Sequence, residues 1–127
     1  MTEQEINQRK SRIYELKDEI RERENTISKI EDEIRSHYIA EAESKFPNIK
    51  RGDKVIVTHQ TWTHKGYVTE KTEPVFFAYA RYNKFAYELN GSRIEFVFKF
   101  PKKNGEPSQK EISYCTGSVV EMEKVNE

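Results

Sequence analysis

Isoleucine recurs every seven residues over the first part of this chain of 127 residues. The repeat consists of Ile6, Ile13, Ile20, Ile27 and Ile34. An apolar residue at every seventh position keeps one stripe of an α-helix against a partner helix while the two helices supercoil. The spacing therefore predicts a long N-terminal helix that takes part in a coiled coil.

The predicted helix has clear limits at both ends. Thr2 followed by Glu5 has the form of a capping box, in which a hydroxyl and a carboxylate satisfy free backbone amides at a helix start. No proline or glycine occurs before Pro47, and the residue that precedes a proline is disfavoured in the helical region. We therefore expect a helix of about 43 residues, or about 65 Å at the usual rise per residue. The expected domains are a coiled-coil helix, 1–47, and a second domain, 48–127.

The other position of the stripe, heptad position d, holds both aliphatic and cationic residues. If the isoleucines occupy position a, then position d holds Leu16 and Ile30 but also Arg9, Arg23 and His37. The pairing should be weaker than that of a uniform zipper, and it can be parallel or antiparallel. We expect a homo-oligomer with a dimer as first choice, although a higher-order bundle stays open because leucine is sparse at d. The predicted self-association surface consists of Ile6, Ile13, Leu16, Ile20, Ile27, Ile30 and Ile34.

Two further features of this helix bear on its packing. Beyond the isoleucine repeat, the apolar stripe moves to a spacing of four at Tyr38, Ala42 and Phe46, which should relax the supercoil near the second domain. A helical hairpin that turns near residues 25–26 and packs on itself is the alternative to a coiled coil. Neither glycine nor proline marks a turn at that place, so the sequence favours the continuous helix.

From Arg51 onward the hydrophobic period changes to two, which is typical of β-strands. Asn90-Gly91 predicts a type I′ hairpin turn, and Asn104-Gly105 lies in a second turn. The clearest alternation places Phe96 and Phe98 on one face of a strand that runs from residue 94 to residue 100. The other expected strands cover 54–58, 66–69, 75–82, 84–89, 112–115 and 119–122. Short strands separated by turn residues predict a small antiparallel barrel, so the expected fold class is α+β.

The start of the second domain resembles a known class of small barrels. Residues 51–57, RGDKVIV, followed by residues 65–68, KGYV, resemble the opening of KOW-type and other SH3-like barrels, where a Gly-Asp turn precedes the first strand. The resemblance covers about twenty residues and implies a small antiparallel SH3-like β-barrel. Barrels of this kind bind RNA, ribosomal or transcription components, DNA or peptides, and the fold does not choose among these partners.

Catalytic and metal chemistry find little support in the residue pattern. His37, His59 and His64 have no thiol or carboxylate at ligand spacing, and a zinc site needs three or four ligands. The single cysteine, Cys115, has no histidine near it in sequence, and phosphate-binding or nucleophile motifs are absent. We therefore expect no enzyme activity, no metal site and no cofactor. One cysteine and no long apolar window fit a cytoplasmic protein that does not enter membranes.

The remaining candidates are residues that could bind a partner. Lysines surround the Asn104-Gly105 turn, and aromatic residues could form an interface hot spot or stack on single-stranded bases. Trp62 could equally be buried at a barrel end. The chain carries 22 basic and 22 acidic residues, so it has no overall attraction to nucleic acid. The predicted partner-binding residues are Trp62, Tyr67, Tyr82, Lys99, Lys102, Lys103 and Lys110.

These observations lead to two hypotheses. The first is a non-enzymatic oligomeric adaptor, in which the coiled coil makes a homodimer and the barrels bind a protein or peptide. The alternative is an accessory protein that binds single-stranded RNA or DNA through the basic hairpins of the barrel. Both hypotheses use the same barrel, but only the second depends on its lysines.

Overall fold

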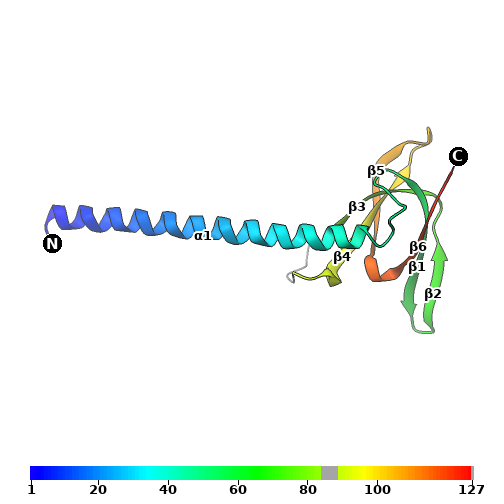
Figure 1. Ribbon diagram of the computed structural model, residues 1–127, viewed down its shortest axis with the longest axis horizontal. Helices are drawn as coiled ribbons and strands as arrows, with labels where there is room; N and C mark the ends of the chain where they lie inside the picture. Colours follow the sequence, from blue (N-terminus) through cyan, green and yellow to red (C-terminus); the bar gives the residue numbers. More distant parts are fainter. Residues whose placement is uncertain (84–88, 127) are drawn as a thin grey trace. The chain divides into compact units, whose positions relative to one another are not determined.

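The structure, a computed structural model, describes residues 1–83 and 89–126 (Figure 1). The chain divides into two compact units, Met1–Ile34 and Arg35–Glu127. This division falls within the N-terminal helix, whereas the sequence places its domain boundary at residue 47, where the helix ends. The reason is that the last turns of the helix contribute side chains to the core of the second unit. Ala42 is the one buried residue of the helix.

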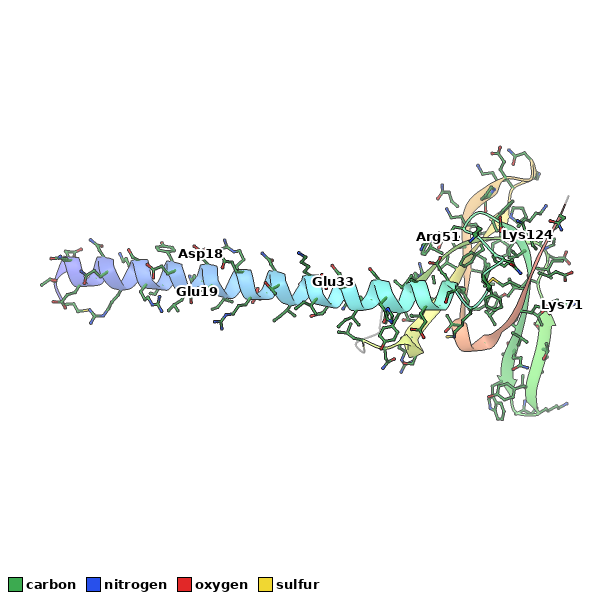
Figure 2. The ribbon with its side chains drawn as sticks, in the orientation of Figure 1. Asp18, Glu19, Glu33, Arg51, Lys71 and Lys124 are labelled. Atoms are coloured by element: carbon green, nitrogen blue, oxygen red, sulfur yellow. The ribbon has the colours of Figure 1, made fainter. Side chains whose placement is uncertain are left out.

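Helix α1, Glu3–Glu43, is continuous over 41 residues. Charged side chains such as Asp18, Glu19 and Glu33 project from it, as Figure 2 shows. It passes through residues 25–26 without a break, and the hydroxyl of Thr26 donates a hydrogen bond of 2.9 Å to the carbonyl of Glu22. The helical hairpin considered above is therefore wrong, and the continuous helix is confirmed.

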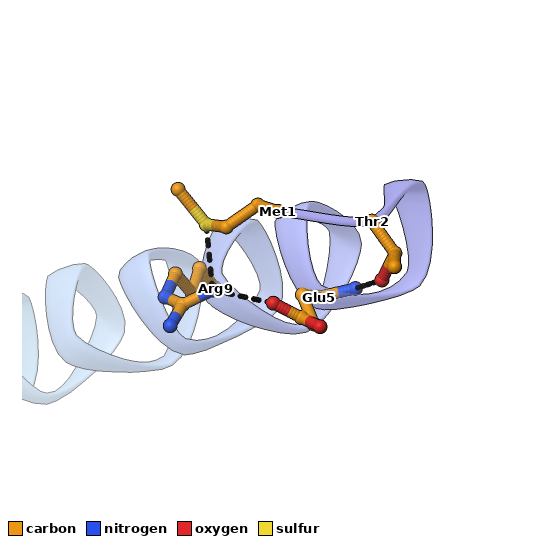
Figure 3. A network of polar contacts seen from close by, with 4 residues as sticks. All are labelled: Met1, Thr2, Glu5 and Arg9. Carbon is orange, nitrogen blue, oxygen red and sulfur yellow. Dashed lines mark hydrogen bonds and ion pairs between the residues drawn. The ribbon is translucent and has the colours of Figure 1, made fainter.

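The start of α1 forms the predicted cap only in part. The backbone N–H of Glu5 donates to Oγ1 of Thr2 at 3.2 Å, which satisfies one free amide of the first turn (Figure 3). The carboxylate of Glu5 does not complete a capping box but lies 3.7 Å from the guanidinium of Arg9, one turn further along. An i,i+4 ion pair therefore takes the place of the reciprocal contact.

The second unit contains an antiparallel sheet. The strands are β1 (Lys54–Thr63), β2 (Gly66–Lys71), β3 (Val75–Tyr82), β4 (Ile94–Pro101), β5 (Pro107–Cys115) and β6 (Val119–Lys124). Their order in the sheet is β2-β1-β3-β4-β5, and β6 pairs with β1. Two short 3-10 turns, Gly91–Arg93 and Thr116–Ser118, precede β4 and β6.

Strand β1 makes the sheet curl, because it pairs with three other strands. It pairs with β2 through Thr58–Thr63, with β3 through Lys54 and Val55, and with β6 through residues 55–59. The result is a curled half-barrel, so the α+β class is confirmed. Among the described residues, no pairing of β5 with β6 closes the sheet, and the finer assignment to SH3-like barrels remains a prediction.

The core of the second unit follows the alternation of its strands. Ile94, Phe96 and Phe98 are at most 1% exposed, and Val55 and Val57 are fully buried on β1. Phe77 lies 5.8 Å from both Phe96 and Phe98, measured between ring centroids. The predicted inward face of β4 is confirmed at these residues, although Val97 on the opposite face is also fully buried.

The apolar residues at the end of α1 belong to this same core. Ala42 is buried, and Tyr38, Ile39 and Phe46 pack against the buried cluster. The ring of Phe46 meets Phe96 edge to face, with centroids 5.8 Å apart. The spacing-of-four stripe predicted after the isoleucine repeat is therefore the face with which α1 packs against its own β-sheet.

The two predicted turns have different outcomes. Gly105 has a φ of 87°, and Lys102 and Glu106 bond across the turn, so the turn at Asn104-Gly105 is confirmed. The type I′ turn at Asn90-Gly91 is wrong, because it needs positive φ at both residues and the φ of Asn90 is −140°. The Asn90 side chain accepts instead from the backbone N–H of Ser92 and caps a 3-10 turn. The expected strand 84–89 falls almost wholly outside the described residues.

Candidate partner-binding surfaces

The predicted self-association surface forms a continuous exposed stripe on α1. Ile13 and Ile30 are 50% exposed, Leu16 is 41% exposed, and Ile20 and Ile27 are 56% and 55% exposed. The end members of the stripe, Ile6 and Ile34, are half-buried. The first compact unit contains no other described element that could cover these side chains. The structure therefore brings the predicted residues together on one open face.

Contacts within the helix do not account for its length. Arg12 lies 3.1 Å from Glu15, and Arg21 lies 3.6 Å from Asp18, with all four side chains at least 59% exposed. Such pairs stabilise a helix by only about 0.2–0.5 kcal/mol each. Helices in proteins gain most of their stability from packing of an apolar face. The exposed stripe is thus the surface from which further stabilisation of α1 can come.

The hairpin of β1 and β2 carries a second exposed apolar surface. Residues 60–63, which lie beyond the expected strand 54–58, extend β1. This extension puts Trp62 directly opposite Tyr67, with ring centroids 4.7 Å apart. Both side chains are 69% exposed, and Val68 beside them is 40% exposed. Trp62 is therefore not a plug of the barrel, and it forms an aromatic pair that a partner can reach.

The predicted lysines lie around the other hairpin, between β4 and β5. Lys102, Lys103 and Lys110 are exposed, whereas Lys99 is half-buried and lies opposite Glu111 in the sheet. The tip of this hairpin and the tip of the β1–β2 hairpin are at opposite ends of the second unit (Figure 1). The lysines and the Trp62–Tyr67 pair therefore do not form one surface.

Tyr82, the last predicted partner-binding residue, packs against the core and is half-buried. Its hydroxyl is buried and has no hydrogen-bond partner within the described part of the chain. Burial raises the pKa of this phenol, and the neighbouring Tyr38 adds to the rise. The structure thus places Tyr82 apart from the exposed aromatic pair.

One cleft contains residues that the sequence did not single out. His59 is only 8% exposed, and its ring stacks on Tyr114 at 4.3 Å and 22°. Glu70, Phe100 and other side chains from β2, β3, β4, β5 and the β2–β3 connection complete the lining. Burial raises the pKa of Tyr114, and the charge of Glu70 raises it further. The sequence considered His59 only as a metal ligand, and its position two residues after the buried Val57 is the signal that would have placed it inside.

Neither a metal centre nor a membrane segment is found in the described part of the chain. No group of three or more His, Cys, Asp and Glu side chains among residues 1–83 and 89–126 could hold a metal ion. In the same residues, no helix combines the length and the apolar character needed to cross a membrane. The surfaces described above are the α1 stripe, the two hairpin tips and the His59 cleft.

If the Trp62–Tyr67 pair serves binding and not folding, then Trp62→Ala should lower the free energy of unfolding by less than about 1 kcal/mol, the value of one cross-strand aromatic pair. Phe77→Ala is the matched core control, since Phe77 is 3% exposed, and it should cost about 3–5 kcal/mol. Urea unfolding followed by far-UV circular dichroism measures both. A loss for Trp62→Ala comparable with that for Phe77→Ala would assign Trp62 to the core.

Comparison of the chain with protein-family models, with curated proteins and with solved structures gave no match. The resemblance of residues 51–70 to KOW-type and SH3-like barrels accordingly remains a prediction.

Proposed function

We propose that this protein is a non-enzymatic, self-associating adaptor. Helix α1 pairs with α1 of a second copy. The sheet formed by strands β1–β6, called the β unit below, binds a protein or peptide partner. The observation that carries the proposal is the row of five aliphatic side chains on α1, each 41–56% exposed at heptad spacing. A row of this length in water is a surface that a partner helix covers.

A second copy of the chain is the simplest partner for this row. Every copy carries the same stripe, and a two-fold symmetric pair uses one patch twice. The mixed d positions include Arg9 and Arg23, whose polar heads can reach water while their stems cover apolar surface. The pair is therefore a specific and moderate association and not a generic zipper.

The β unit supplies the site for the other partner. Trp62 and Tyr67 are large, exposed and held edge to face on a hairpin, which is the kind of anchor that dominates protein interfaces. A dimer presents this anchor twice. Two weak contacts joined in one molecule bind a repeated or extended partner more tightly than either contact does alone.

The alternative function, binding of single-stranded nucleic acid, has a weaker basis. Lys102, Lys103 and Lys110 form a small basic tip, but Arg81 on the same sheet is held by Glu95 at 2.8 Å and by Glu111 at 3.9 Å. Stacking aromatics and phosphate-binding lysines work together in such sites. The distance between the two hairpin tips separates these two parts, so we favour the protein partner.

The first test concerns the stripe. The double variant Ile20→Lys/Ile27→Lys should weaken self-association at least about 100-fold, because burial of one aliphatic side chain is worth about 1.5–3 kcal/mol and 1.4 kcal/mol is a factor of ten. Equilibrium sedimentation of the full chain measures the change. Tyr14→Lys is the matched control: Tyr14 is 67% exposed on α1 but lies off the stripe, and its replacement should leave association unchanged.

The outcomes of this test are distinct. A wild-type chain that is monomeric at tens of micromolar contradicts the proposal. A wild-type oligomer that both variants preserve shows that another surface assembles the protein, and this also contradicts the role given to the stripe.

The second test separates the two functions. Fluorescence anisotropy of a labelled single-stranded RNA should show no saturable binding to the full chain at low salt, about 50 mM. The alternative predicts binding that falls about 10³-fold or more between about 50 and 200 mM salt if six or more phosphates are contacted, and less for fewer contacts. Substitution of Lys102, Lys103 and Lys110 by Ala would then abolish it, whereas the exposed Lys50→Ala control would not. That pattern would replace the adaptor with the nucleic-acid function.

A further inference from the structure

The charged residues that flank the stripe on α1 are arranged in blocks. Heptad position e holds Lys10 and Lys17 in the first half of the helix, and Glu24 and Glu31 in the second half. Lys10, Lys17 and Glu24 are exposed, and Glu31 is half-buried. Residues at e and g border the contact between paired helices and set the partner and its direction. The block order therefore carries information about how two copies of α1 meet.

We propose that two copies of α1 pair antiparallel, in the register that sets Ile13 of one copy opposite Ile30 of the other. This proposal rests on the proposed self-association and specifies its geometry. In this register a residue at position a of one copy faces a residue at position d of the other, and the two residue numbers add up to about 43. The helices therefore overlap from residue 6 to residue 37.

Charge complementarity selects this arrangement. In an antiparallel pair, position e faces position e and position g faces position g. In the proposed register, Lys10 then faces Glu31 of the second copy, and Lys17 faces Glu24. On the other flank, Arg12 faces Glu33. The two-fold axis repeats each of these contacts, and none of them joins like charges.

A parallel pair in register fails on the same residues. Position g then faces position e of the next heptad, which sets Arg12 against Lys17 and Glu19 against Glu24 of the second copy. Like charges at such positions oppose association. Glu5 against Lys10 is the one attractive contact of opposite charges that this arrangement keeps.

The non-aliphatic d positions point to the same conclusion. In a parallel pair, d faces d, so Arg9, Arg23 and His37 would each meet their own copy in the centre of the contact. In the antiparallel register Arg9 faces Ile34, Arg23 faces Ile20, and His37 faces Ile6. Each long cationic side chain then lies over an apolar one and extends its head to water. The cationic residues at position d therefore favour the antiparallel direction of pairing, in addition to weakening the pairing.

The orientation has a consequence for the adaptor. Two copies of His37 in this register are separated by 31 residues along the contact, or about 47 Å at the usual rise per residue. A parallel pair would bring them side by side. The antiparallel pair therefore carries the C-terminal ends of its two helices at opposite ends of the contact, which suits a partner with widely spaced sites.

The decisive test exchanges the charge blocks in the full chain. Variant one carries Lys10→Glu/Lys17→Glu, and variant two carries Glu24→Lys/Glu31→Lys. In the antiparallel register each variant alone sets like charges at every e contact, so each should self-associate at least about tenfold more weakly than the wild type. A mixture of the two restores opposite charges everywhere and should form a heterodimer, measured by sedimentation with one variant labelled.

A smaller version of the test avoids the half-buried Glu31. Lys17→Glu and Glu24→Lys, both at exposed positions, should likewise associate with each other in preference to themselves. Far-UV circular dichroism of each variant checks that α1 is intact. The heterodimer preference should also fall as salt is raised, because the contacts are solvent-exposed charge pairs.

The result that overturns the orientation differs from the result that overturns self-association. If the pair is parallel, variant two should self-associate more tightly than the wild type, because Glu19 then faces a lysine at position 24. The two variants should then not associate with each other in preference to themselves. That outcome refutes the antiparallel register and leaves the adaptor in place. A wild-type chain that does not self-associate at all refutes the proposed function itself.

Discussion

The apolar stripe of α1 is the constraint on which the organisation of this chain depends. A helix of 41 residues carries one apolar stripe, and five aliphatic residues of that stripe are 41–56% exposed. Surface ion pairs such as Arg12 with Glu15 contribute only a few tenths of a kcal/mol each. The free energy that keeps such a helix ordered in water comes from burying its face. In the proposed dimer, pairing with a second copy provides that burial, and the charges at the borders of the stripe favour the antiparallel direction.

The same helix changes role along its length. Up to Ile34 the isoleucines of the stripe repeat every seven residues, and the stripe is exposed from Ile13 to Ile30. Ala42 and Phe46 further on pack in the core of the β unit. Arg51 donates two hydrogen bonds, of 2.7 and 2.8 Å, to the carboxylate of Glu43 in the last helical turn, and this contact raises the pKa of the guanidinium. The end of the helix is therefore fixed to the β unit by apolar packing and by this ion pair. The sheet in turn has its own core, so the exposed Trp62–Tyr67 pair is held in place independently of self-association.

Sequence reasoning succeeded where one physical effect dominates. The helix and its limits follow from periodicity and from Pro47, and the face of β4 follows from alternation. It failed at Asn90-Gly91, where the Asn90 side chain caps a 3-10 turn and competes with the hairpin geometry. It also missed the extension of β1, because residues 60–63 protrude with neither face in the core and so show no alternation of apolar and polar residues. The stacking of His59 on Tyr114 joins strands far apart in sequence, which no local pattern reports.

The most direct test of the central claim is a distance between two copies of α1. Ser11 is exposed at the outward position f and can be replaced by a spin-labelled cysteine, with Cys115, which is also exposed, changed to serine. In the antiparallel register the two labels are offset by 21 residues, which is about 32 Å along the helix axis. Two helix diameters, about 20 Å, separate them across the axis. The distance between the labels measured by pulsed electron paramagnetic resonance should therefore be roughly 38 Å. A distance near 20 Å, about two helix diameters, would contradict the antiparallel direction. The absence of any dipolar coupling at concentrations of tens of micromolar would contradict the pairing of α1 itself.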